Sequence, residues 1–438
     1  MKSQFLLKLA QKIQLTCRLP RSVSFGEKVD ALLAGSSATS ITDEQYISGE
    51  SFSSKSLHDN SIRRNIILVA SVNLPLFDQN SGALRLKNLI RLMSEAGWTI
   101  VFGSVYKRSK QPGLVSRRKG RKFYEDALRA DGVSHFLYGM TEIESFLVQA
   151  GKELDWAFLS FPTIAARLIS RVRSRCATAR IAFDMVDFHA LRLMREAALH
   201  NDHELQIEAE RQREEELACV KSADVTFAVT QEEKALLSEL VPEAVVEVLP
   251  NVFDIPRRTY VGPAGRKGIL FVGGFLHKPN VDAICWFMDR IWPLILREEP
   301  DTFISVAGSS PSDEVLALGA QTGVEVLGFV PDLMPLYDRH RVAIAPLRYG
   351  AGMKGKVGQS LLCGLPMVAT SIGAEGMGLL NETHLLISDD EAAFATNVRR
   401  LLHDDILWSN LSVDGRKHIE QTLSMDVVGK LLKKVLEV

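Results

Sequence analysis

Long apolar runs, paired cysteines and a strong charge of one sign are all missing from this sequence. No apolar stretch reaches the roughly 18 residues of a membrane-spanning helix. The five cysteines form no C-x-x-C pair, which argues against a zinc module and indicates a reducing compartment. A net charge of -1 argues against a general nucleic-acid binder. The sequence therefore predicts a cytoplasmic protein that binds no nucleic acid.

Two ligand-binding signatures are missing as well. The pattern G-x-G-x-x-G does not follow the first apolar run, Ile66 to Val72, which counts against a nicotinamide oxidoreductase. No Asp-x-Asp motif is present, so we expect no metal ion and no other cofactor. Helix N-termini and lysines would then have to neutralise any phosphate that the protein binds.

The length of 438 residues predicts at least two domains. The stretch from about Ser22 to Arg64 is rich in Ser, Gly, Asp and Glu, and we expect residues 1–64 to be a mobile or loosely packed leader. The basic, partly apolar start lacks the long apolar core of a secretory signal. Phe5 to Leu19 could form a short amphipathic helix, which leaves a plain surface helix and contact with a membrane surface both open.

Buried apolar runs alternate with helical segments along the rest of the chain, which predicts parallel sheets in Rossmann-like domains. The pattern stops in a stretch rich in Pro, Gly and Arg, and then restarts at Gly268. We therefore predict an N-terminal domain over residues 65–256, a linker over 257–267, a C-terminal domain over 268–420 and a last helix over 421–438.

The segment from Arg348 to Met377 carries the clearest chemical signal. It is expected to leave a strand, pass through a glycine-rich turn, form a helix, break at Gly-Leu-Pro and enter a second buried strand. Gly350 and Gly352 would let backbone N–H groups approach an anion, and Lys354 and Lys356 would add positive charge there. This order suits a ligand that contains a diphosphate.

The same segment resembles the donor-binding signature of family 4 glycosyltransferases. The resemblance implies a GT-B fold, in which two Rossmann-like domains face a central cleft and the last helix returns to the N-terminal domain. It also implies transfer with retention at the anomeric carbon. Relatives have glutamates where this sequence has Ala351 and Gln359. Gln359 keeps an oxygen that can accept a hydrogen bond from a donor ribose, without the charge. Glu375 would contact the donor sugar or cap the turn.

A second glycine turn, Gly273-Gly274, ends the first predicted strand of the C-terminal half. Pro279, Asn280 and Asp282 are ordinary residues for a helix start. The resemblance implies that this turn and Lys278 contact the donor phosphates. Phe275 stands about where relatives carry an arginine.

In the N-terminal half, Ser81 is a natural N-cap for a helix over about residues 83–96. The resemblance implies that this loop faces the donor diphosphate, where Gly82 would permit close approach and Arg85 could reach an anion.

A second candidate group follows a buried strand that ends near Val186, where relatives often carry a histidine. This chain has His189 three residues later, and we predict that His189 and Asp187 are catalytic residues. Asp184 and Asp187 are candidates for orienting the imidazole or meeting the acceptor.

These features together predict a glycosyltransferase of the hexosyltransferase type. It would move a sugar from a nucleotide sugar to a hydroxyl of a glycan or lipid-linked acceptor, in glycan or surface polysaccharide synthesis. Contact with the inner face of a membrane stays open. Two alternatives stay open too: a nucleotide-sugar epimerase, and a non-catalytic nucleotide-sugar-binding protein, for which Ala351 and Gln359 would mark a degenerate site.

Overall fold

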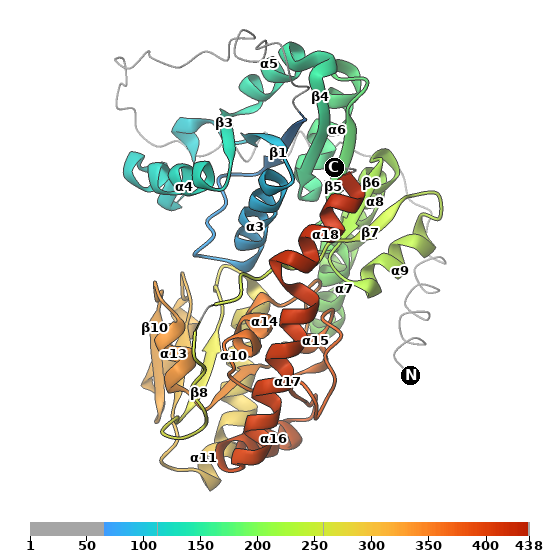
Figure 1. Ribbon diagram of the computed structural model, residues 1–438. Coiled ribbons are helices and arrows are strands. Elements are labelled where there is room, and N and C mark those ends of the chain that lie inside the picture. The colour runs from blue at the N-terminus through green and yellow to red at the C-terminus, as the bar shows by residue number, and fades with distance from the viewer. Residues whose placement is uncertain (1–64, 112, 257, 437–438) are drawn as a thin grey trace. The chain divides into compact units, whose positions relative to one another are not determined.

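The computed structural model describes residues 65–111, 113–256 and 258–436. The predictions for the leader 1–64, including the helix over Phe5 to Leu19, lie outside these residues. The described chain folds into two parallel sheets, each flanked by helices (Figure 1). This arrangement confirms the predicted pair of Rossmann-like α/β domains.

The first sheet has seven strands in the order β3-β2-β1-β4-β5-β6-β7. Its inner strands are apolar because both of their faces are covered, and all six residues of β1 are buried. The sequence did not predict β3, because this edge strand includes the exposed Ser134 and the partly buried His135 and so forms no apolar run. The strands are β1 Ile66–Ser71, β2 Thr99–Ser104, β3 Val133–Tyr138, β4 Leu154–Ser160, β5 Arg180–Asp184, β6 Val225–Ala228 and β7 Val246–Val248.

Helices connect these strands in the order expected for a doubly wound sheet. They are α3 Ser81–Glu95, α4 Arg118–Ala130, α5 Met140–Ala150, α6 Pro162–Arg175, α7 His189–His200, α8 His203–Ser222 and α9 Gln231–Leu240, with short 3-10 turns η2 Arg108–Lys110, η3 Gly113–Ser116 and η4 Gly151–Glu153.

The second sheet has six strands in the order β10-β9-β8-β11-β12-β13, which repeats the winding of the first. Only β13 escaped the sequence analysis, because two residues are too few to show a pattern. The strands are β8 Ile269–Val272, β9 Ile304–Ala307, β10 Val324–Gly328, β11 Val342–Ala345, β12 Met367–Ala369 and β13 Leu386–Ile387.

The helices of this second half begin with α10, which continues into a π-helical turn, η5. They are α10 Lys278–Trp286, η5 Phe287–Ile291, α11 Trp292–Glu298, α12 Asp313–Ala317, α13 Met334–Arg339, α14 Gly355–Leu362, α15 Ser371–Ala374, α16 Glu391–His403, α17 Asp405–Leu423 and α18 Met425–Leu436, with a 3-10 turn η6 Leu318–Ala320.

Both sheets change winding direction beside their first strand, between β1 and β4 and between β8 and β11. Ligands of open α/β sheets bind outside the carboxyl ends of the strands at such switch points. The winding therefore puts the loops after β1, β4, β5, β8 and β11 at the places where a site is expected.

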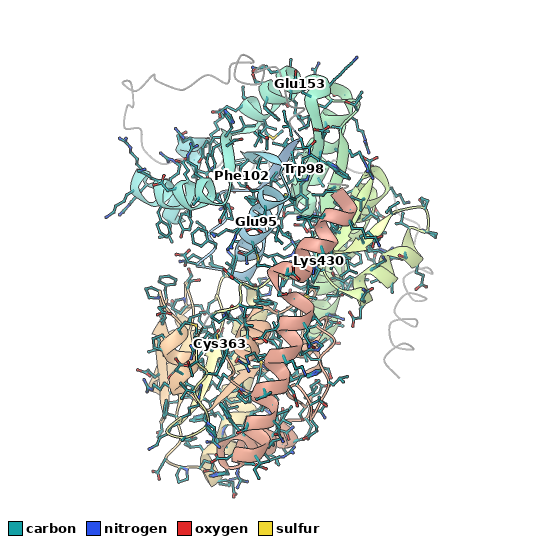
Figure 2. The ribbon with its side chains drawn as sticks, viewed as in Figure 1. Glu95, Trp98, Phe102, Glu153, Cys363 and Lys430 are labelled. Atoms are coloured by element: carbon teal, nitrogen blue, oxygen red, sulfur yellow. The ribbon has the colours of Figure 1, made fainter. Side chains whose placement is uncertain are left out.

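The chain end returns to the first sheet. The backbone N–H of Phe253 donates to the carbonyl of Leu423, where α17 ends and α18 begins. Val428, Leu432 and Leu436 of α18 then join the same hydrophobic cluster as Trp98 and Phe102 of the first domain. Figure 2 shows Lys430 on α18, and Trp98 and Phe102 among the side chains of that domain.

No helix within the described residues is long and apolar enough to span a membrane.

We predict that α18 is part of the cooperative core of the first domain. Leu432 is 1% exposed and its neighbour Leu431 is 41% exposed, so the two leucines form a matched pair. Leu432→Ala should lower the free energy of unfolding by about 2–5 kcal/mol, because it leaves a cavity. Leu431→Ala should cost less than about 1 kcal/mol. Urea unfolding of both variants measures the difference, and equal losses would show that α18 is not packed as described.

Candidate functional site

The glycine-rich turn predicted to bind phosphate lies between β11 and α14. Gly352 has a φ of 63°, and a Cβ added to it would lie 3.0 Å from Cβ of Asp187. Gly350 is also in a conformation with positive φ. Only glycine fits these positions without strain, because the turn closes tightly against the loop that follows β5.

Three charged side chains join this turn to the rest of the site. Arg195 on α7 donates to both carboxylate oxygens of Glu375 at 2.8 Å, and also to the carbonyl of Gly350. Nζ of Lys354 lies 2.9 Å from the carbonyl of Gly352 and 3.3 Å from Glu375. Burial opposes the charge on Glu375, but the bonds from Arg195 and Lys354 hold its pKa below the ordinary value. We call Arg195, Glu375 and Lys354 the latch.

Lys356 lies beside the other predicted phosphate turn. Its Nζ donates to Oδ1 of Asn280 and sits 4.6 Å from the centre of the Phe271 ring. A Cβ on Gly273 would lie 3.0 Å from the same Nζ. The structure thus brings Lys354, Lys356 and the Gly273-Gly274 turn together. Within the described residues no carboxylate is ion-paired with Lys356.

Burial, together with the charge of Lys354, lowers the pKa of Lys356 to about 7. The pKa of Lys354 is also lowered by burial, although Glu375 opposes this. Arg195 and Lys354 share one close carboxylate, that of Glu375, and no carboxylate of the described residues pairs with Lys356. This region therefore has room for a negative ligand charge.

Other predicted donor residues have weaker ties to the cluster. Lys278 opens α10 and is 79% exposed, with its nearest carboxylate, on Glu196, at 3.9 Å. Gln359 on α14 donates from Nε2 to the sulfur of Cys363 at 3.4 Å, which leaves its amide oxygen for another partner. Ala351 lies within the turn and adds no polar side chain.

His189 begins α7 directly after β5, at the carboxyl edge of the first sheet. Its Nδ1 lies 3.1 Å from Asp187 and 3.2 Å from Glu216. Glu216 is fully buried and accepts the backbone N–H groups of His189 and Ala190 at 3.0 and 2.9 Å. Burial opposes protonation of His189, but the two carboxylates raise its pKa above the ordinary value.

The backbone around His189 is unusual. Phe161, after β4, has a φ of 81°, and Val186, after β5, has a φ of 67°. Neither residue is a glycine, so both backbone conformations are strained. Favourable packing of the surrounding residues must offset the free-energy cost of this strain. Such residues tend to occur at functional sites, and these two flank the imidazole: the Phe161 ring lies 6.3 Å from that of His189.

Two expectations for the N-terminal half are wrong. The N-cap of α3 is Asn80, whose Oδ1 accepts the N–H of Ala83 at 2.8 Å, and not Ser81. Arg85 is buried and donates to Asp184 at 2.9 Å and to the carbonyls of Leu249 and Pro250, so it is not free to reach an anion.

Asp184 is committed to Arg85 and also accepts from Ser160 at 2.8 Å, instead of orienting His189. Its place is taken by Glu216, which sequence reasoning missed. Gly82 lies in the first turn of α3, where an added Cβ would be 3.6 Å from Val186, an ordinary contact distance.

Glu233 is a second residue that sequence reasoning missed. Its carboxylate accepts the backbone N–H groups of Phe188, Val229 and Gly352, so it joins the loop after β5 to the phosphate turn. Thr230 caps α9 by accepting the N–H of Glu233 at 3.0 Å, and this Thr-x-x-Glu spacing is visible in the sequence. The carboxylate of Glu233 accepts the N–H of Val229 and not that of Thr230, so the capping box is incomplete. Burial and the charge of Asp187 raise the pKa of Glu233 to about 7, although the backbone N–H groups that it accepts oppose this rise.

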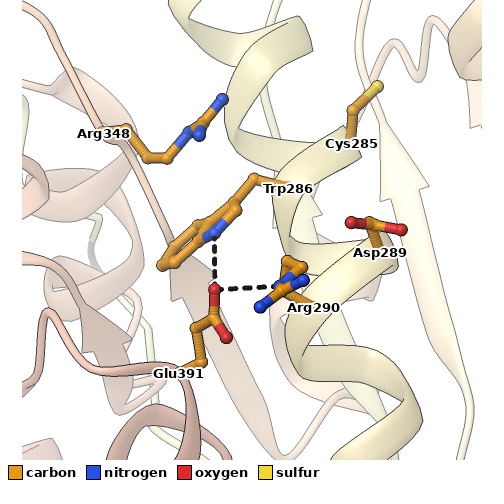
Figure 3. A pocket seen from close by; sticks show the side chains of 6 residues that line it. All are labelled: Cys285, Trp286, Asp289, Arg290, Arg348 and Glu391. Carbon is orange, nitrogen blue, oxygen red and sulfur yellow. Dashed lines mark hydrogen bonds and ion pairs between the residues drawn. The ribbon is translucent and has the colours of Figure 1, made fainter. Parts of the chain in front are cut away.

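A separate cavity of about 380 Å³ lies on the second domain beside α10 and η5. Figure 3 shows Trp286 and Arg290 both directed at the carboxylate of Glu391, with hydrogen bonds of 3.3 and 3.1 Å. Arg348, just before the phosphate turn, points toward this cavity and is held by Asp282. None of the predicted site residues lines it, so we do not assign the donor to this cavity.

The two carboxylates beside His189 give a pH prediction. Because the folded-state pKa of His189 is raised above 6.5, its protonation stabilises the fold below that pH, and this contribution is lost as pH rises through the folded pKa. Asp187→Asn should lower the pKa of His189, as measured by NMR titration of the ring. Asp126→Asn, on the exposed face of α4, is the matched control. An unchanged titration in Asp187→Asn would contradict the contact.

Comparison with known proteins finds a family match for part of the chain. Residues 266–404 match the family described as Glycosyl transferases group 1. A segment of 138 residues is 28% identical to an uncharacterized 44.6 kDa protein in the cps region of Klebsiella pneumoniae. That match covers 30% of this chain and 36% of the relative's length.

Solved structures extend the likeness over most of the fold. Sucrose-phosphate synthase from Thermosynechococcus elongatus has a TM-score of 0.64 at 14% identity, over 85% of this chain and 98% of that one. Anabaena HepE in complex with UDP-glucose has a TM-score of 0.61 at 12% identity, over 85% and 99%. At such identities the likeness shows the fold, which is GT-B. Residues 266–404 are thus similar to a group 1 glycosyl transferase domain, in a chain with the GT-B fold.

Proposed function

We propose that this protein transfers a sugar from a nucleotide sugar to a hydroxyl group of an acceptor, in the synthesis of a surface polysaccharide. The observation that carries the proposal is the group of three cations, Arg195, Lys354 and Lys356, beside the Gly273-Gly274 turn. Arg195 and Lys354 share the carboxylate of Glu375, while Lys356 has no carboxylate partner among the described residues. Support for the biological role comes from the relative in a cps region.

The donor diphosphate would lie between the two glycine turns. There it would meet Lys356 and the N-terminus of α14, whose first helical residue is Gly355. Lys354 and Glu375 would lie behind the diphosphate and form that side of the donor site. Arg195 would hold Glu375 in place through its hydrogen bonds. Charge on the departing diphosphate would be neutralised by these groups, so the proposed reaction needs no metal ion.

The acceptor would approach from the first domain, where His189 and Asp187 stand at the carboxyl edge of the sheet. The carboxylates of Asp187 and Glu216 at Nδ1 favour a proton on that nitrogen, which leaves Nε2 as the atom that can face a substrate hydroxyl. We place His189 at the acceptor for this reason. Membership of family 4, and with it retention at the anomeric carbon, is part of the proposal.

A non-catalytic binding protein and an epimerase remain as second candidates. Ala351 and Gln359 favour the former, because each replaces a carboxylate found in relatives. A thermal-shift screen against UDP-, GDP-, ADP- and dTDP-sugars first identifies the donor, since a bound ligand raises the melting temperature. Donor consumption with and without acceptor then separates the three. Transfer requires acceptor, epimerisation does not, and a binding protein consumes none.

The diphosphate assignment predicts a specific loss of affinity. Lys356→Met should weaken binding of the selected nucleotide sugar by about 1–3 kcal/mol, because a charge-assisted hydrogen bond disappears. Lys267→Met removes the same charge just before β8, at the opposite edge of the sheet, and should change binding by less than about 0.5 kcal/mol. Isothermal titration measures both, and equal affinities in the two variants would remove Lys356 from the site.

Gln359 tests whether the ribose position is retained. Gln359→Glu should bind the nucleotide sugar as tightly as wild type or more tightly, because a carboxylate is the stronger acceptor for a hydroxyl. Gln359→Leu should weaken binding, since the ribose hydroxyl loses its partner. If the leucine variant binds as well as wild type in the same titration, Gln359 does not contact the ribose.

A further inference from the structure

One segment of the first domain has a charge very unlike that of the whole chain. Residues 107–129 contain nine Lys and Arg but only two acidic residues, although the complete sequence has a net charge of -1. The segment forms the connection between β2 and β3, through η2, η3 and α4. The basic side chains are Lys107, Arg108, Lys110, Arg117, Arg118, Lys119, Arg121, Lys122 and Arg129.

Most of this positive charge faces solvent without neutralisation. All of these side chains are exposed except Arg121, which is partly buried. Arg108 and Arg121 share Glu125, and Lys122 pairs with Asp126 at 2.9 Å. Within the described part of the chain, no ion pair involves the run Arg117, Arg118 and Lys119. An ordinary solvated helix face would mix both signs of charge more evenly.

Exposed apolar side chains lie within the same segment. Leu114 is 53% exposed and Phe123 is 56% exposed. Val115, Tyr124 and Leu128 of the same segment are buried in the hydrophobic cluster of the first domain, so the segment is anchored. We call the exposed residues of 107–123 the basic-apolar face. Basic residues around protruding Leu and Phe are what binding at the interface of an anionic bilayer requires.

The basic-apolar face is connected to the proposed acceptor side. It follows β2, whose carboxyl end lies at the same sheet edge as the loop after β1. The hydroxyl of Tyr124 donates to Asp78 of that loop at 2.7 Å, and Phe77 packs against Tyr124 with ring centres 5.2 Å apart. The next residue, Gln79, contacts Ser309 of the second domain.

We propose that the basic-apolar face docks the protein on a bilayer that contains anionic phospholipids. Lys and Arg would meet the lipid phosphates, while Leu114 and Phe123 would enter the interface. The docking itself follows from the charge and the exposed apolar groups alone. Its role, to bring a lipid-linked acceptor to the edge of the first sheet, rests on the proposed function.

Co-sedimentation of the full chain with lipid vesicles tests the docking. Wild-type protein should bind vesicles of phosphatidylcholine and phosphatidylglycerol at 3:1, bind pure phosphatidylcholine poorly, and lose binding as salt rises. The triple variant R117Q/R118Q/K119Q should reduce partition at least about tenfold. F123S should reduce it as well, because its apolar contact is lost.

The matched control is K417Q/K433Q/K434Q, which removes three exposed charges from α17 and α18 and should bind like wild type. The melting temperature of each variant shows that it is folded. The proposal would be overturned if the two triple variants bound anionic vesicles equally well. It would also be overturned if the wild-type protein bound neutral vesicles as well as anionic ones, or preferred a DNA duplex to vesicles. A thermal shift with nucleotide sugar reports on the proposed function separately, so failure of one is distinguishable from failure of the other.

Discussion

The site depends on a shared carboxylate. Glu375 receives two hydrogen bonds from Arg195 of the first domain and lies 3.3 Å from Lys354 of the second. Burying these charges costs desolvation free energy. The ion pairs and hydrogen bonds of the latch offset that cost only if the loops that carry the three side chains keep this geometry. Glu233 adds a second tie through the N–H of Gly352. The geometry of the phosphate turn is therefore set jointly by both domains, while Lys356 beside it is left for an anionic ligand.

The two-domain fold was largely predictable because buried parallel strands are continuous apolar runs. All of the described strands except β3 and β13 lie in such runs, as β1 and β11 do. β3 was missed because an edge strand buries only part of its surface, and β13 because it has two residues. The return of the chain end to the first sheet came from the family resemblance, since periodicity shows that α18 is amphipathic but not what it packs against.

The site was predictable where glycine and lysine are close in sequence, as in the turn from Gly350 to Lys356. It was not predictable where partners are distant. Glu216 is one of several acids on a charged helix, and only the tertiary fold buries it beside His189. The same holds for Arg195, which is 180 residues from Glu375. Arg85 and Asp184 carried misleading signals, because each looked free for a ligand and instead satisfies the other in the core.

The central claim is that a diphosphate binds the protonated side chain of Lys356, and proton uptake on binding tests it most directly. With a pKa of about 7, Lys356 is mostly uncharged at pH 8 in the free protein. A bound diphosphate should raise that pKa, so binding should take up as much as about one proton. Calorimetry of the selected nucleotide sugar in buffers of different ionisation enthalpy measures this number. We predict that the wild type takes up protons on binding and that this proton uptake disappears in Lys356→Met. No proton uptake in the wild type, or the same uptake in the variant, would contradict the claim.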